Sequence, residues 1–236
     1  MLCCKLVIKL SIFVTGDVHG QLGIKRLTKQ NFPEQFKLTR QDYLIQLGDL
    51  GLLWKKDKTY KYLLDFYTSR NYTLLWIDGN HENFTMLNNY PVIEWNGGNV
   101  HIIADNIIHL MRGQVYNIED CLFFTLGGGK SLDKSIRTLD VTWWKEEELN
   151  YNECINAIDN LEKYDYQVDY VITHSAPFSV KNLLGFEDTS TTERFLQQLI
   201  NQYNITFNKW FIGHYHLDNV ISDKFYFIYN NIYKLK

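Results

Sequence analysis

The sequence predicts an α/β fold in a single domain. Five short apolar runs each end near a glycine or threonine that an Asp, Asn or His follows directly, and segments with helical periodicity separate most of them. Strand and helix therefore alternate along the chain. With 236 residues, of which 45% are hydrophobic, the chain is long enough for one sizeable core, and no tract resembles a linker. We expect one domain over residues 1–236.

The five apolar runs are interpreted as buried strands, because four to six apolar residues before a turn residue are typical of strands covered on both faces. They span residues 12–15, 43–47, 74–77, 170–173 and 210–212. The first belongs to an apolar segment over residues 6–14. A strand is favoured there over a secretory signal, because Lys9 interrupts the segment and no small-residue cleavage site follows. Residues 1–5 are expected to be a ragged extension.

Helices are expected over residues 21–30, 58–70, 152–164 and 191–203, the last of them with Ser190 and Glu193 as a capping box. The middle of the chain differs. Residues 100–104 and 107–112 flank Asp105-Asn106 like a hairpin, and residues 121–126 form a further strand. We expect these segments to build a second, more antiparallel sheet, which residues 219–222 and 225–229 continue.

Charge and cysteine content limit the partners and the compartment. A formal net charge of -3 provides no broad basic field, so tight binding of long nucleic acid is not expected. No apolar run reaches the roughly 18 residues that a membrane span needs. The four cysteines, Cys3, Cys4, Cys121 and Cys154, have no C-x-x-C spacing, which suits a reducing compartment. A cytoplasmic protein is the expectation.

The polar residues after the five strands are candidate metal ligands. Singly, each is as well explained by a turn or by a hydrogen-bonded buried histidine. Together they are two carboxylates, one amide and four imidazoles, which suits Mn, Fe, Zn or Ni rather than a thiolate site. Seven ligands exceed one ion and fit two ions about 3.5–4 Å apart with one carboxylate shared. The set is Asp17, His19, Asp49, Asn80, His174, His214 and His216.

Five short motifs contain these residues, namely Gly16-Asp17-Val18-His19-Gly20, Gly48-Asp49, Gly79-Asn80-His81-Glu82, Thr173-His174 and Gly213-His214-Tyr215-His216. In this order they make the chain similar to the calcineurin-like metallophosphoesterase superfamily over residues 11–218. The resemblance implies a four-layer α/β/β/α sandwich of two mixed sheets. It also implies two divalent transition metal ions, with manganese favoured over iron, zinc or nickel.

The resemblance further implies a role for each motif residue. One ion would be held by Asp17, His19 and His216, and the other by Asn80, His174 and His214. Asp49 would bridge them. His81 resembles the residue that contacts phosphate beside Asn80 and helps to protonate the leaving group, as an imidazole can near neutral pH. The expected activity is hydrolysis of a phosphate ester by a metal-bridging hydroxide.

Departures from the family pattern narrow the substrate. The GDxxDR continuation is absent after Gly48-Asp49, and the arginine that often precedes GNHE is replaced by the Ile77-Asp78 neighbourhood. A small phosphodiester or nucleotide is therefore favoured over a phosphoprotein, with a Ser/Thr phosphoprotein phosphatase as the alternative. A metal-free scaffold and a nuclease rank lower. The monoester or diester preference and the oligomeric state stay open.

Three further groups have two interpretations each. Lys130, Lys134 and Arg137 would share a face if their segment were helical, and either clamp phosphate or form a solvated basic surface. Core packing is favoured over base stacking for the tryptophans Trp54, Trp143 and Trp144. The acidic run 146–148 indicates the first turn of a helix or a solvated run rather than a further metal site.

Overall fold

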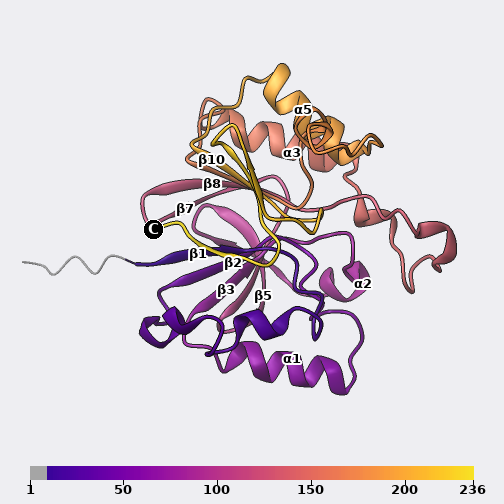
Figure 1. Cartoon of the computed structure of the whole chain (residues 1–236). Coiled ribbons are helices and arrows are strands. Elements are labelled where there is room, and N and C mark those ends of the chain that lie inside the picture. Colours follow the sequence, from indigo (N-terminus) through magenta and orange to yellow (C-terminus); the bar gives the residue numbers. More distant parts are fainter. Residues whose placement is uncertain (1–9) are drawn as a thin grey trace, which may run out of the picture.

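The computed structural model describes residues 10–236, so the start of the predicted first strand segment, with Cys3 and Cys4, lies outside the described residues. Two β-sheets face each other, and helices cover their outer faces (Figure 1). The chain thus forms the expected four-layer α/β/β/α sandwich of two mixed sheets.

The first sheet has seven strands, and four of them are parallel neighbours. Its order is β13 (Ile232–Lys234), β1 (Ile12–Thr15), β2 (Tyr43–Gln46), β3 (Thr73–Trp76), β6 (Ile107–Leu110), β5 (Gly98–Ala104) and β4 (Val92–Trp95). The second sheet has six strands. Its order is β11 (Asn219–Ile221), β12 (Phe225–Phe227), β10 (Lys209–Ile212), β9 (Tyr170–Thr173), β8 (Cys121–Leu126) and β7 (Gln114–Ile118).

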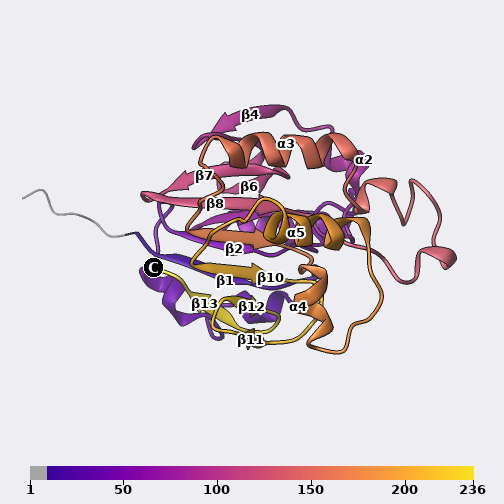
Figure 2. The same ribbon diagram turned by 90° about the horizontal axis from the view of Figure 1, so that it is seen from above.

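Helix α1 (Lys58–Thr68) covers the first sheet, and α3 (Tyr151–Glu162) and α5 (Thr191–Asn201) cover the second (Figures 1 and 2). Two short helices, α2 (Phe84–Leu87) and α4 (Phe178–Asn182), follow β3 and β9. The α5 capping box is present as predicted, because the Ser190 side chain accepts from the Glu193 N–H and the Glu193 side chain accepts from the Ser190 N–H.

Three layers of apolar side chains hold the sheets and helices together. The central layer joins the two sheets through residues such as Ile45 and Phe211. The outer layers place Leu63 of α1 on the first sheet and Leu196 of α5 on the second. Since both faces of each central strand are buried, these strands are continuous apolar runs rather than alternating ones.

The hairpin over residues 100–112 is present, but its predicted sheet was wrong. Strands β5 and β6 belong to the first sheet, where β6 pairs in parallel with β3. All four residues of β6 are buried, so this strand fits the middle of a sheet and not an edge. Strands β8, β11 and β12 do belong to the second sheet, as predicted.

The helix predicted over residues 21–30 was also wrong. Only one turn of 3-10 helix forms there, η1 (Ile24–Leu27). The Arg26 side chain donates to the backbone carbonyls of Gly23 and Asp17, which holds the chain in a tight turn below the end of β1. The segment therefore supports the loop after β1 instead of covering the sheet.

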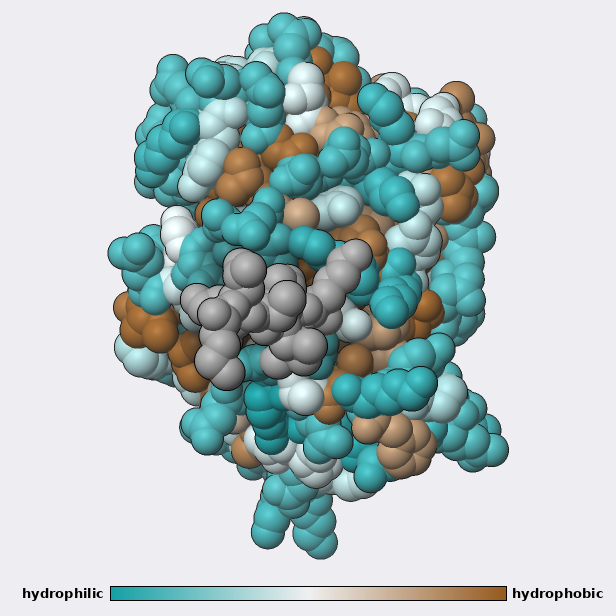
Figure 3. Space-filling view, turned by 90° about the vertical axis from the view of Figure 1, so that its left-hand side faces the viewer, coloured by the Kyte–Doolittle hydropathy of each residue, from teal (hydrophilic) through white to brown (hydrophobic). Residues whose placement is uncertain are grey.

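The connection from β8 to α3, residues 127–150, projects beyond the sheets on the side where the central strands end (Figures 1 and 2). It holds two single 3-10 turns, η3 (Lys134–Ile136) and η4 (Lys145–Glu147). The opposite side of the molecule, from which β1 starts, shows polar residues with small separate apolar patches outside the grey atoms (Figure 3). In the described part of the chain, no helix has the length and apolar character needed to cross a membrane.

Candidate metal centre

The ends of five strands, β1, β2 and β3 from one sheet and β9 and β10 from the other, meet at one side of the sandwich. The polar residues that follow these strands come together there. The candidate ligands therefore come from the strand ends of both sheets and not from one sheet alone.

Four of these residues have a left-handed backbone, which turns the chain sharply at each strand end. The φ angles are 49° at His19, 54° at Asp49, 67° at His214 and 49° at His216. Asp and His tolerate this region better than most residues, although it remains less favourable than for glycine. Sharp turns at the strand ends bring the side chains back over the sheets and toward one another.

Two glycines leave room for this crowding. A Cβ atom on Gly48 would overlap the ring of His174, and one on Gly79 would overlap the carboxylate of Asp49. A side chain at either position would push two candidate ligands apart. Both glycines therefore have a steric reason, and Gly48, with a φ of 98°, has a conformational one as well.

The first group of candidate ligands is Asp17, His19 and His216. The Nε2 atoms of His19 and His216 are 2.9 Å apart, and Nε2 of His216 lies 3.1 Å from Oδ2 of Asp17. Two ligands about 2.1 Å from one ion and at right angles are about 3.0 Å apart, so these separations fit a shared metal ion.

The second group is Asp17, Asp49 and His174. Two more predicted ligands adjoin it, since Oδ1 of Asn80 lies 2.9 Å and Nδ1 of His214 lies 3.2 Å from Nε2 of His174. The Nδ1 atom of His174 is 2.7 Å from the carbonyl oxygen of Leu47, which can only accept a proton. Its Nε2 atom is therefore free to bind a metal.

Asp17 belongs to both groups, and Asp49, a member of the second, also lies near the first. Its Oδ2 atom is 3.7 Å from Nε2 of His19 and also 3.7 Å from Nε2 of His174. A carboxylate oxygen at equal distance from a ligand of each group is placed to be shared by two ions. The other oxygen, Oδ1, accepts the backbone N–H of His81 at 2.7 Å, which fixes the orientation of the carboxylate.

The pKa shifts of two predicted ligands favour the deprotonated form, whereas the hydrogen bond to Asp17 raises the pKa of a third, His216. Burial raises the pKa of Asp17, but the nearby His174 ring and the hydrogen bond with His216 outweigh it and lower this pKa to about 2. Burial and the neighbouring His174 ring lower the pKa of His214 to about 3. A metal needs an ionised carboxylate and neutral imidazoles, so the shifts of Asp17 and His214 favour binding.

His81 lies beside the candidate ligands and not among them. Its ring meets that of His19 edge to face at 5.5 Å between centroids. An arginine nitrogen, NH1 of Arg137, is 2.8 Å from its Nδ1 atom. Arginine can only donate, so Nδ1 accepts and the neutral ring carries its proton on Nε2. Burial, with a smaller effect of Arg137, lowers the pKa of His81, which keeps the ring neutral near pH 7.

A model of the calcineurin-like phosphoesterase family matches residues 10–218, which include all five strand ends. The chain belongs to the calcineurin-like phosphoesterase family. A search of the curated proteins found no match to the chain. Membership indicates a hydrolase that acts on phosphate esters and a site for divalent metals, which agrees with the two groups of Asp and His ligands.

In this phosphoesterase a cavity of about 330 Å³ adjoins the candidate ligands Asp49, Asn80, His214 and His216. Of the three cations predicted to bind phosphate, only Lys130 lines it. Its Nζ atom is 3.3 Å from Oδ2 of Asp188.

A helix that would place Lys130, Lys134 and Arg137 on one face, the condition for a shared basic face, is not present. The segment contains only the turn η3, so the three side chains diverge. Lys134 faces the ring of Trp143 at 5.8 Å and does not line the cavity. Arg137 reaches the site through His81 and is tied by NH2 to Oδ2 of Asp133 at 2.8 Å.

Several supporting residues carry no motif signal and were missed by the sequence analysis. Ser131 Oγ accepts a hydrogen bond from Nδ2 of Asn80 at 3.0 Å, which turns the amide oxygen of Asn80 toward His174. Lys181 is almost fully buried and pairs with Glu193 at 2.9 Å. Glu193 in turn accepts the hydroxyl of Tyr215 at 2.9 Å, which anchors the loop between His214 and His216.

Glu147 corrects the prediction of an exposed acidic run. Its side chain is buried at the η4 turn, and within the described structure neither carboxylate oxygen has a hydrogen-bond partner. Burial raises its pKa to about 7, although the Ser131 hydroxyl and the Arg137 charge act in the opposite direction. An acidic side chain among the loops of the site could not be distinguished by sequence from its exposed neighbours.

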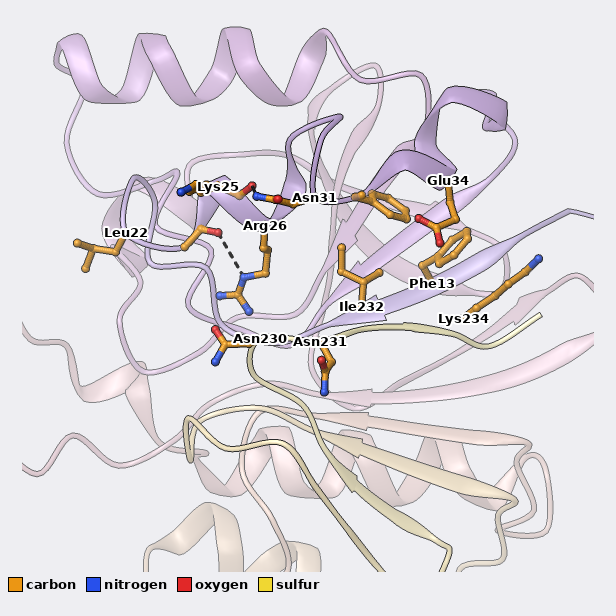
Figure 4. A pocket seen from close by; sticks show the side chains of 12 residues that line it. Phe13, Leu22, Lys25, Arg26, Asn31, Glu34, Asn230, Asn231, Ile232 and Lys234 are labelled. Atoms are coloured by element: carbon orange, nitrogen blue, oxygen red, sulfur yellow. Dashed lines mark hydrogen bonds between the residues drawn. The ribbon is translucent and has the colours of Figure 1, made fainter.

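Arg26 supports the other side of the centre. It donates from Nε to the carbonyl of Gly23 at 3.3 Å and also to the carbonyl of Asp17, beside a cavity of about 640 Å³ (Figure 4). Its guanidinium faces the ring of Tyr229 at 5.3 Å, and this ring stacks on His216 at 4.5 Å. The η1 turn therefore steadies two ligands of the first group.

Proposed function

We propose that the chain is a binuclear metal-dependent phosphoesterase that hydrolyses a small phosphodiester or a nucleotide. The observation that carries the proposal is the position of Asp49, whose Oδ2 atom is equally far from a histidine of each ligand group. Two ions, when bound, would supply a water that is acidic enough to attack at neutral pH and would neutralise the phosphate oxygens. Manganese remains the expected metal.

The protein groups around the ions then have separate tasks. His81 presents Nε2–H, which can donate to a phosphate oxygen or to the leaving oxygen as the ester bond breaks. Lys130 borders the cavity and can bind a second phosphate or the charge on a terminal one. A volume of about 330 Å³ lies at the lower end for a small-molecule site, which favours a small substrate.

A phosphoprotein phosphatase is the second candidate. It is favoured by the nearby cations, because Arg137 and Lys130 could balance the dianion of a phosphate monoester. Arg137 is, however, committed to His81, Thr142 and Asp133. It would have to leave these partners to grip phosphate, so we rank this function below the first.

The experiment is a screen of the protein reconstituted with Mn, Fe, Zn or Ni against cyclic and linear nucleotides, dinucleoside polyphosphates, bis-aryl phosphate and phosphoserine peptides. We expect turnover of nucleotides or diesters with about two metal equivalents per chain. The matched control is the Asp49→Asn variant prepared in the same way. A preference for the phosphopeptide would reverse the order of the two functions, and one metal equivalent in an active protein would contradict the binuclear centre.

Arg137→Ala is expected to lower kcat on bis-aryl phosphate about 10- to 100-fold with metal content unchanged, because His81 then loses the donor that fixes its proton on Nε2. Steady-state kinetics with elemental analysis test this. Lys134→Ala is the control, since this neighbouring cation does not line the cavity, and it should match the parent. Partial rescue of Arg137→Ala by added guanidinium would support the role, whereas unaltered kinetics would refute it.

A further inference from the structure

A second cavity, of about 420 Å³, shares His81 with the cavity that holds Lys130. His19 and His81 form part of its wall, and Trp54, Leu22, Gly20 and Gly51 border it. Of these residues, His19 is a candidate metal ligand and His81 lies beside the ligands. A phosphate bound at the metal centre would therefore adjoin both cavities.

Trp54 is more exposed to solvent than a tryptophan of the hydrophobic core. Its relative exposure is 36%, compared with 2% for Trp144, and the neighbouring Leu22 is 88% exposed. The sequence analysis favoured core packing for all three tryptophans, and this holds for Trp144 but not for Trp54. A large apolar ring left open beside a catalytic centre is a feature of ligand sites.

Trp54 is also held firmly in place. Trp144 meets its ring edge to face at 5.6 Å between centroids, and the Nε1–H of Trp144 donates to Oγ1 of Thr85 at 2.9 Å. The Nδ2–H of Asn83 donates to the backbone oxygen of Trp54 at 2.8 Å. A ring fixed by a buried neighbour and by its backbone loses little freedom when a ligand stacks on it.

The two cavities differ in charge. Among the described residues, no lysine, arginine, aspartate or glutamate borders the Trp54 cavity. The other cavity is bordered by Lys130, Lys181, Asp133, Asp188 and Glu193. The Trp54 cavity thus suits a flat uncharged group, and the Lys130 cavity suits a charged one.

We infer that the Trp54 cavity binds the planar aromatic ring of the substrate, such as a nucleobase, while the attached phosphate lies at the metal centre. The inference rests on the proposed function, which places a phosphate ester at the metal centre. It adds the chemical class of the group that is attached to this phosphate. A nucleobase fits because stacking on a tryptophan needs a π-face and no opposite charge. The substrate class is therefore a nucleotide or nucleoside phosphodiester rather than a sugar phosphate or an alkyl diester.

Calorimetric binding to the metal-loaded protein tests this with two ligands that share a phosphate, adenosine monophosphate and ribose phosphate. Trp54→Ala is expected to raise the Kd for adenosine monophosphate about 10- to 100-fold and to leave that for ribose phosphate within about twofold. Trp54→Phe keeps a ring and should retain most of the affinity, which guards against a fold defect in Trp54→Ala. Trp143→Ala, in the loop outside both cavities, is the matched control.

The outcomes separate this inference from the proposed function. Equal loss for both ligands, or no loss for either, would overturn the stacking site even in a protein that hydrolyses esters. A selective loss in Trp54→Ala would support it. Because the measured quantity is affinity and not hydrolysis, this result would stand if hydrolysis of every tested ester failed.

Discussion

Asp49→Asn is expected to abolish turnover of a generic aryl phosphate ester, a loss of at least about a thousandfold in kcat, while the protein stays folded. The neutral amide cannot supply the shared negative oxygen that lies 3.7 Å from both His19 and His174. Its Oδ1 atom can still accept the N–H of His81, so the loop after β3 should keep its position. Kinetics, elemental analysis and thermal unfolding together provide the measurement.

His81→Ala is the comparison that separates metal binding from catalysis. Both variants should be inactive, but only Asp49→Asn should lose bound metal, because His81 is not among the ligand groups. Retained activity in both variants would defeat the assignment of the site. Full metal content in inactive Asp49→Asn would show instead that the carboxylate acts on the substrate and not as a bridge.

The helices and strands that could be predicted are those whose sequences have a clear apolar pattern and whose apolar residues are buried in the fold. The runs that became β1, β2, β3, β9 and β10 are mostly apolar, and each helix over about ten residues carried a periodic apolar face. The sequence could not predict which sheet contains the hairpin β5–β6. A hairpin pattern indicates that its two strands pair with each other, but not which further strand pairs with the hairpin. The η1 turn was missed because the tertiary contacts of Arg26, not local propensity, decide its length.

The residues of the site also fall into those that the sequence could predict and those that it could not. All seven candidate ligands lie within four residues of a strand end, so their convergence could be inferred from strand ends alone. The residues that support them come from loops and carry no spacing signal. Ser131, Glu147 and Arg137 lie in the connection between β8 and α3, whose irregular path brings Arg137 to His81 and has no periodic pattern in the sequence. Side-chain contacts between loops depend on the whole fold.

Below the centre, a buried ion pair connects the loop after β3 to the projecting connection. The guanidinium of Arg112 donates from Nε to Oδ2 of Asp78 at 2.8 Å and from NH2 to the backbone oxygen of Glu146 at 2.6 Å. The backbone oxygen of Asp78 accepts the N–H of Gly128 at 3.0 Å. Although burial opposes ionisation, Arg112 and His109 lower the pKa of Asp78, so this carboxylate stays charged.

Arg112→Met is therefore expected to lower the free energy of unfolding by about 3–5 kcal/mol, because it leaves the buried charge of Asp78 without its main partner. The double variant Asp78→Asn/Arg112→Met removes both charges and should recover about 1–3 kcal/mol of that loss. Urea unfolding of the two single variants and the double one measures the coupling.

Glu153→Gln is the matched control. It removes only the half-exposed partner, 3.2 Å from NH1 of Arg112, and glutamine can still complete the capping box of α3. A loss of at most about 1 kcal/mol is expected there. Strictly additive losses for Asp78→Asn and Arg112→Met would mean that the pair contributes no more than two separate contacts. Strong coupling would instead identify this pair as the contact that holds the Ser131 and Arg137 connection against the metal centre.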